Sequence, residues 1–300
     1  MIMKYAIFGK PRSRLTGERS LASGERRRPA GERFQPRARF RAYARFMGAA
    51  TVANFQSVIE YRASFLLQVF GMMLNNGAFA LFWAVLIGKT GGVGGYGFSD
   101  IMFVWALVST AFGIAHVVFG NVRSIGRIVM EGELDLYLLQ PKNVMLNILA
   151  SRTVVSAWGD LIYGFIVLAM LPGFGIGRLA LFAALSLSGS IILTAIFAAA
   201  ESLTFFMGNS SAVSQAAAEF MLSFSLYPES IHGAGTRWLL YTILPSAFVA
   251  FVPLAAFTRM DWLAVPLLFG IAAVYMTASH CLFSLGLRRY ESGNQIGMRL

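Results

Sequence analysis

A polar segment between two strongly apolar stretches carries most of the chemistry-bearing residues. Residues 121–144 read NVRSIGRIVMEGELDLYLLQPKNV. Arg123 and Arg127 are four residues apart, so they share one face of a helix, with an apolar face beside them. An amphipathic helix, an acidic turn and a leucine strip suit docking on a cytoplasmic partner, although a loop that only covers a helix bundle shows the same pattern. The residues predicted to form the contact surface are Arg127, Glu131, Gly132, Glu133, Leu134, Asp135 and Leu138.

Other reactive residue types lack the spacing that catalysis or metal binding requires. Gly88-Lys89-Thr90 ends like a phosphate-binding loop, but Trp83 stands where that motif needs its first glycine. Ser210, in a Gly-Asn-Ser sequence, and His280 form a serine–histidine pair only if they meet in space. His116, His232 and His280 have no ligand spacing, so neither a metal site nor a cofactor is predicted.

The composition indicates a membrane protein. Of the 300 residues, 57% are hydrophobic and 13% are charged, whereas soluble domains carry about 25% charged residues. Of the net charge of +11, residues 1–62 carry +10, because they hold 14 Lys and Arg against 4 Glu. A basic segment before the first membrane span is typical of a topology signal, and this favours a cytoplasmic N-terminus over nucleic-acid binding.

The hydropathy pattern predicts an all-α polytopic membrane protein with about six transmembrane helices. A span needs about 20 apolar residues, and five stretches qualify: 63–88, 101–122, 145–171, 179–200 and 262–286. Because both ends are basic, an even number of spans is expected. We therefore interpret 211–227 as the fifth span and 238–258, broken by Pro245 and Pro253, as a re-entrant external hairpin. An amphipathic helix beginning near Phe40 is predicted to lie along the cytoplasmic interface.

Charged residues inside apolar stretches are candidate functional positions, because lipid disfavours them. Asp160 lies within the stretch 145–171 and is the candidate for a translocation path. Arg152 is nearer the start of that stretch, where its side chain can reach the interface. Glu201 and Glu219 flank a predicted cytoplasmic turn and are expected to be solvated. The large apolar residues that either line a hydrophobic path or simply pack are Met72, Met73, Phe79, Phe82 and Trp83.

Four features, taken in order along residues 40–290, resemble the permease subunits of type-2 ABC exporters, in the branch of stand-alone six-span permeases. They are an amphipathic helix ending in Glu60-Tyr61-Arg62, the segment Gly132-Glu133-Leu134-Asp135 leading to Leu138-Leu139-Gln140-Pro141, the pair Tyr227-Pro228, and the proline-broken run 238–258.

The resemblance implies a dimer of permeases, homo- or heteromeric, in the cell (inner) membrane. It also implies that a separate ATP-binding subunit hydrolyses ATP and that substrate moves outward, so this chain would have no ATPase site of its own. Carried over by position, the coupling helices lie within 40–60 and within 123–139. Residues 1–36 are expected to be a disordered basic tail, 37–290 the permease domain, and 291–300 a cytoplasmic tail.

Two other function classes remain open at the level of sequence. A secondary transporter or channel is expected to show an internal repeat with paired broken helices, and here only one proline-broken segment is present. An intramembrane serine protease would need contact between Ser210 and His280.

Overall fold

The computed structural model describes residues 36–291. The predicted tails therefore fall, apart from their inner ends, outside the described residues. The chain divides into two units at Ala42, and the described part of the first unit is the beginning of helix α1 (Pro36–Ile59). The second unit begins at Tyr43. Across residues 36–291 the chain forms helices, turns and one isolated bridge between Val93 and Tyr96, which confirms the all-α prediction.

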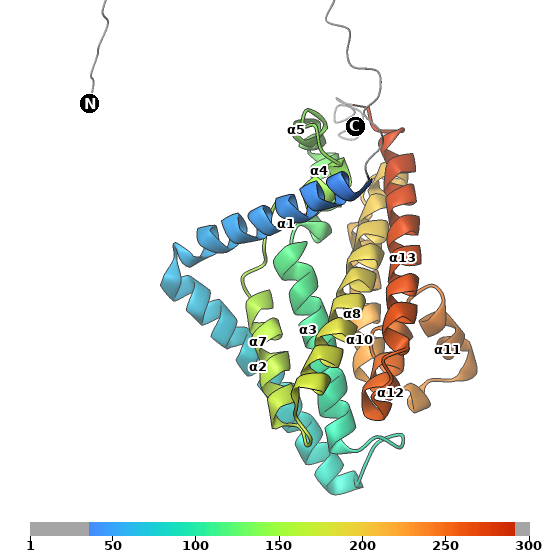
Figure 1. The fold of residues 1–300 in the computed structure, drawn as a ribbon. Helices are drawn as coiled ribbons and strands as arrows, with labels where there is room; N and C mark the ends of the chain where they lie inside the picture. Colours follow the sequence, from blue (N-terminus) through green and yellow to red (C-terminus); the bar gives the residue numbers. More distant parts are fainter. Residues whose placement is uncertain (1–35, 292–300) are drawn as a thin grey trace, which may run out of the picture. The chain divides into compact units, whose positions relative to one another are not determined.

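Four helices of the described part are long and apolar enough to cross a membrane (Figure 1). They are α2 (Arg62–Thr90), α3 (Phe98–Val118), α8 (Ile176–Ser202) with its continuation α9 (Thr204–Met207), and α13 (Ala264–Leu287). They coincide with the predicted spans 63–88, 101–122, 179–200 and 262–286. The polytopic membrane fold is thus confirmed.

The predicted continuous span over 145–171 is wrong in its first half. That segment forms the short helix α6 (Val144–Leu149), an irregular stretch and then the 14-residue helix α7 (Ala157–Met170). Polar side chains from elsewhere stabilise the break: the Asn54 amide donates to the Ala150 carbonyl at 2.9 Å, and the Asn121 amide donates to the Ser151 hydroxyl at 2.7 Å. These bonds supply the partners that an interrupted helix needs within a membrane protein.

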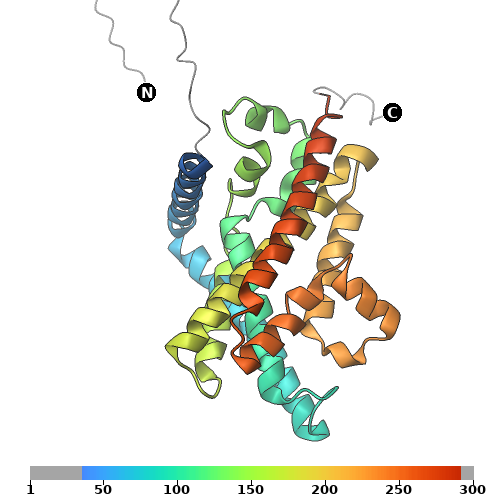
Figure 2. The ribbon, with the colours of Figure 1, turned by 45° about the vertical axis from the view of Figure 1, so that its right-hand side comes forward.

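The ambiguous stretches form one short helix and one bent segment. Helix α10 (Ser211–Leu226) has 16 residues and packs on α8 and α3. Beyond it, α11 (Ala234–Tyr241) and the run that contains α12 (Phe251–Arg259) meet at a 68° bend. Figures 1 and 2 show that this segment begins and ends at the same end of the bundle, as a re-entrant hairpin does. The described residues contain four candidate spans, or five with the bent pair, so a count of six stays a prediction.

The interior of the second unit is built around α3 and α8. Of the apolar window of α3, 83% is buried, and the corresponding share for α8 is 61%. Helix α7 approaches α3 closely because both carry glycine at the contact. A Cβ at Gly164 would lie 2.5 Å from the Ala106 carbonyl oxygen, and one at Gly113 would lie 2.7 Å from the Leu161 nitrogen.

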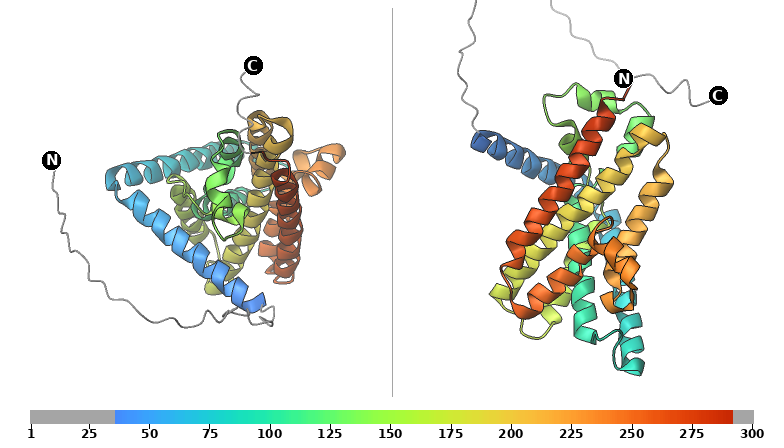
Figure 3. Two further views of the ribbon diagram at one scale, coloured as in Figure 1. Left: turned by 90° about the horizontal axis from the view of Figure 1, so that it is seen from above. Right: turned by 90° about the vertical axis from the view of Figure 1, so that its right-hand side faces the viewer.

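From Tyr43 onward, α1 runs across the end of the bundle rather than along it (Figure 3). Its half-buried residues recur at helical spacing and include Met47, Phe55 and Ile59, as the predicted amphipathic pattern requires. The Phe55 ring lies 4.7 Å from that of Trp158, which attaches this helix to the beginning of α7. Opposite this end, the chain turns at 91–97 and 171–175 (Figure 1).

Candidate functional site

The segment 122–138 forms three short helical pieces that project beyond α3 at the same end of the bundle as the last turn of α13 (Figure 1). They are η1 (Val122–Ser124), α4 (Ile125–Met130) and α5 (Leu134–Leu138). Gly132, at φ +75°, makes the sharp turn between α4 and α5, in a backbone region that favours glycine. The segment is therefore an ordered double turn of helix, and we call residues 122–138 the coupling loop.

The coupling loop is attached to the bundle by its apolar face. Ile125, Ile128 and Leu134 are fully buried and belong to the main hydrophobic core. Leu134, predicted to lie on the contact surface, instead anchors α5. The opposite face is exposed: Leu138 is 42% exposed, and Leu136 and Leu139 still more so. The leucine strip thus divides into an anchor and an exposed apolar patch.

Three of the predicted contact residues form one charged cluster on the exposed face. The Arg127 guanidinium donates to the Glu131 carboxylate at 2.5 Å and to the Glu133 carboxylate at 3.2 Å. These two carboxylates, Glu133 first, raise the pKa of Arg127 above its ordinary value. In the part of the chain that the structure describes, these are the ion pairs present. Asp135 lies apart from them, beside Tyr290, whose pKa is raised by burial and by the negative charge of Asp135.

Glu201 fixes the coupling loop to two helices. Its side chain is buried, so the prediction of simple solvation is wrong for Glu201, whereas Glu219 is exposed as expected. One carboxylate oxygen of Glu201 accepts from the Gly126 backbone N–H at 2.9 Å, and the other accepts from the Ser214 hydroxyl at 2.5 Å. The sequence signal for this residue is weak, because no local pattern indicates that Gly126 and Ser214 lie beside it.

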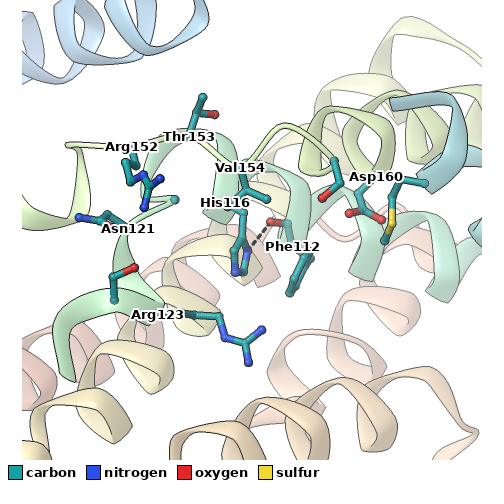
Figure 4. Close-up of a pocket in the computed structure, with 12 residues that line it drawn as sticks. Phe112, His116, Asn121, Arg123, Arg152, Thr153, Val154 and Asp160 are labelled. Carbon is teal, nitrogen blue, oxygen red and sulfur yellow. Dashed lines mark hydrogen bonds between the residues drawn. The ribbon is translucent and has the colours of Figure 1, made fainter. Parts of the chain in front are cut away.

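Asp160 lies between two adjoining cavities. Its carboxylate is 3% exposed, and one oxygen accepts from the Asn76 amide at 2.7 Å. The first cavity, of about 690 Å³, is polar and is lined by His116, Arg123 and Arg152 among others (Figure 4). The second, of about 740 Å³, is mainly aromatic and lies between α2, α3, α7 and α10. Met72, Phe112 and Asp160 line both.

Four of the five large apolar residues named from the sequence line the aromatic cavity: Met72, Phe79, Phe82 and Trp83. Sequence reasoning did not identify Trp105, whose ring stacks on Phe79 at 4.8 Å. It also missed Asn76, because an asparagine in an apolar helix gives no indication of its partner. Asp160 itself lines both cavities, and its role in translocation stays a prediction.

The serine–histidine pair does not form. The Ser210 hydroxyl is buried and bonds to the Thr204 hydroxyl at 2.5 Å. His280 is on α13, and its Nδ1 lies 3.4 Å from the Met145 sulfur. The cavity that His280 lines does not include Ser210. The geometry gives no support to a protease.

Comparison with known proteins agrees with this arrangement. A family described as ABC-2 family transporter protein matches residues 73–294, from the middle of α2 to just beyond α13. No curated protein and no solved structure matches the chain. The resemblance drawn from the four sequence features is thus confirmed at the level of the family. Because the match covers most of the chain and nearly all of the bundle, this protein belongs to the ABC-2 family of membrane permeases of ABC transporters.

Proposed function

We propose that this chain is the membrane subunit of an ABC exporter, working as a dimer of permeases whose ATP is hydrolysed by a separate ATP-binding subunit. The coupling loop contacts that subunit, with help from α1. Both termini lie in the cytoplasm, and the protein lies in the cell (inner) membrane. The permease domain is 37–290, with the basic N-terminal tail and a short C-terminal tail outside the bundle.

The observation that carries this proposal is the exposed face of the coupling loop. It places an apolar patch, Leu136, Leu138 and Leu139, beside the charged cluster of Arg127 and Glu133. An apolar patch rimmed by charged groups is typical of a protein–protein contact. The basic residues before the first span favour a cytoplasmic location for this end of the bundle, which is where an ATP-binding subunit would be available.

The attachment of the loop explains how movement would reach the bundle. Three buried aliphatic side chains and the Glu201 carboxylate join the loop to α8, and the Ser214 bond extends the connection to α10. A helix pair held this firmly moves as a unit when its outer face is displaced. Discrete rearrangement of packed helices is the usual route from such a displacement to a change of state.

Affinity purification of the tagged full chain in gentle detergent is the first test. The expected result is a stoichiometric second chain with the sequence motifs of an ATPase, and ATP hydrolysis in the eluate. A chain that purifies alone, under conditions where a control exporter stays intact, would overturn the proposal and favour a secondary transporter or channel.

A double variant, Glu133→Gln with Leu138→Ala, tests the assigned surface. We expect about tenfold weaker retention of the ATP-binding subunit, or loss of its transport-coupled ATP hydrolysis, because central contact residues carry most of an interface's affinity. Both side chains are partly exposed, so the bundle should remain folded. The matched control is Glu219→Gln with Leu263→Ala, two exposed residues away from the loop. Wild-type coupling in the first variant would exclude the coupling loop as the contact.

A further inference from the structure

The aromatic cavity has the size and lining of a binding site for an organic molecule. Sites for such ligands enclose roughly 300–1,000 Å³ and are mostly apolar with a few placed polar groups. Here the volume is about 740 Å³, and the walls include Phe79, Phe82 and Trp83 of α2 and Trp105 of α3. The polar groups at its inner end are Asn76 and Asp160.

Asp160 is a buried carboxylate, and only one of its two oxygens accepts a hydrogen bond. Asn76 donates to Oδ1, whereas Oδ2 is buried and has no hydrogen-bond partner. Among residues 36–291, no lysine, arginine or histidine nitrogen lies within 4.0 Å of it. Burying a carboxylate that has no paired cation is costly, so a positively charged partner at this position would be strongly favoured.

The arginines near this region face the other cavity. Figure 4 shows Arg123 and Arg152 on the opposite side of His116 and Phe112 from Asp160. They line the polar cavity and do not line the aromatic one. The aromatic cavity therefore contains one acidic group and no basic residue among its lining side chains, and ring faces add attraction for a cation.

We propose that the aromatic cavity binds an organic cation with an aromatic or bulky apolar body, its positive charge beside the Asp160 carboxylate and its body against Phe79, Phe82 and Trp105. This inference rests on the proposed function, since the bound cation would be the class of compound that the transporter moves. Asn76 then acts as a positioning residue that orients the carboxylate towards the cavity.

Two probes of matched shape and opposite charge test this assignment: tetraphenylphosphonium and tetraphenylborate. Binding to the purified full chain in nanodiscs is followed by tryptophan fluorescence, with empty nanodiscs subtracted. Tetraphenylphosphonium should bind saturably and, because its charge attracts the Asp160 carboxylate whereas that of tetraphenylborate is repelled, about tenfold more tightly than tetraphenylborate. Asp160→Asn, which keeps the side-chain shape, should remove that preference, whereas the exposed control Asp261→Asn should keep it.

A second variant guards against misfolding as an explanation. Phe82 is partly exposed at the cavity wall, so Phe82→Leu should leave the fold intact and weaken tetraphenylphosphonium binding by about threefold to tenfold. The proposal is overturned if the two probes bind equally to the unaltered chain, if neither binds saturably, or if Asp160→Asn binds the cation as tightly as the unaltered chain does.

This test is separable from that of the proposed function, because binding needs no ATP-binding subunit. Charge-selective binding that depends on Asp160, in a chain that recruits no ATPase, would retain the site and overturn the exporter. A chain that binds an ATPase but does not bind the cation selectively would support the exporter proposal and overturn the proposed cation site.

Discussion

The two inner helices and the two outer helices of this chain differ far more in burial than in hydropathy. Within the apolar windows, 83% of α3 and 61% of α8 are buried, against 17% for both α2 and α13. The mean hydropathies of these windows are 2.0 and 2.2 for the inner pair and 1.6 for each outer helix. Hydropathy identifies all four as candidate spans and says little about which surround the core.

Small residues make the difference between the pairs. Helix α8 buries Ser186, Ser188, Gly189 and Ser190, and α3 meets α7 through glycines on both sides. Small side chains let helix backbones approach closely, which is a main source of helix association in lipid. Helix α2 instead exposes Leu66, Leu67, Phe70 and Leu74, so its outer face is available to lipid or to a second permease.

A methyl group at Gly164 should break the inner contact and give the largest effect. A Cβ there would lie 2.5 Å from the Ala106 backbone oxygen and closer still to the Thr110 hydroxyl. Overpacking of this kind costs about 1–3 kcal/mol and sometimes more. We expect Gly164→Ala to lower the yield of monodisperse protein and its thermal unfolding midpoint in detergent.

Gly71→Ala on α2 is the matched control, because nothing lies within 4 Å of a Cβ at Gly71. Alanine there should be neutral or slightly stabilising, since alanine has a higher helix propensity than glycine. Equal loss of stability in the two variants would contradict the division into inner and outer helices.

Truncating one leucine on each kind of helix should give a difference of the same sign. Leu107 of α3 is fully buried, whereas Leu67 of α2 is 73% exposed. Leu107→Ala leaves a cavity and should destabilise by about 2 kcal/mol or more. Leu67→Ala exchanges one lipid contact for another and should change little, because lipid tails are as apolar as leucine.

Thermal unfolding of the two leucine variants, measured with and without an ATP-binding subunit, compares the loss of stability at the inner and the outer helix. A large effect of Leu67→Ala would mean that this face of α2 is covered by protein rather than by lipid.

The features that depend on local pattern could be predicted from the sequence. Four spans follow from apolar length alone, and the bend in 234–259 falls next to Pro245, one of the two prolines noted in the sequence. The face of α1 was predictable from its spacing of apolar residues. The coupling loop, too, is visible as a polar segment between two spans.

Features that depend on long-range contacts could not be predicted. The break at 150–156 is stabilised by Asn54 and Asn121, which are distant in sequence. The burial of Glu201 depends on the position of Gly126 and Ser214, and the orientation of the Asp160 carboxylate depends on Asn76. In each case an ordinary polar residue acquires its role from a partner that no local pattern specifies.

At its end, the outer helix α13 contributes buried residues to the interior. A substitution that acts on this end has the smallest expected effect. Although only 17% of the apolar window of α13 is buried, Phe283 and Gly286 are buried in its last turns, and the Tyr290 ring lies 6.4 Å from the Phe205 ring. The pKa of Tyr290 is raised above 10.0 by burial and then by Asp135 of the coupling loop. Asp135→Asn should therefore lower that pKa, although only in part, because burial is the larger cause of the shift and remains in the variant.

Ultraviolet titration of the tyrosines checks this, with Tyr290→Phe to identify the transition that belongs to Tyr290. The neutral tyrosine is favoured in the folded state, so its contribution to stability is present below pH 10.0 and is lost as the pH rises through the raised pKa. An unchanged transition in Asp135→Asn would show that the last turn of α13 does not feel the charge of the coupling loop. The end of α13 would then have no electrostatic connection to the coupling loop.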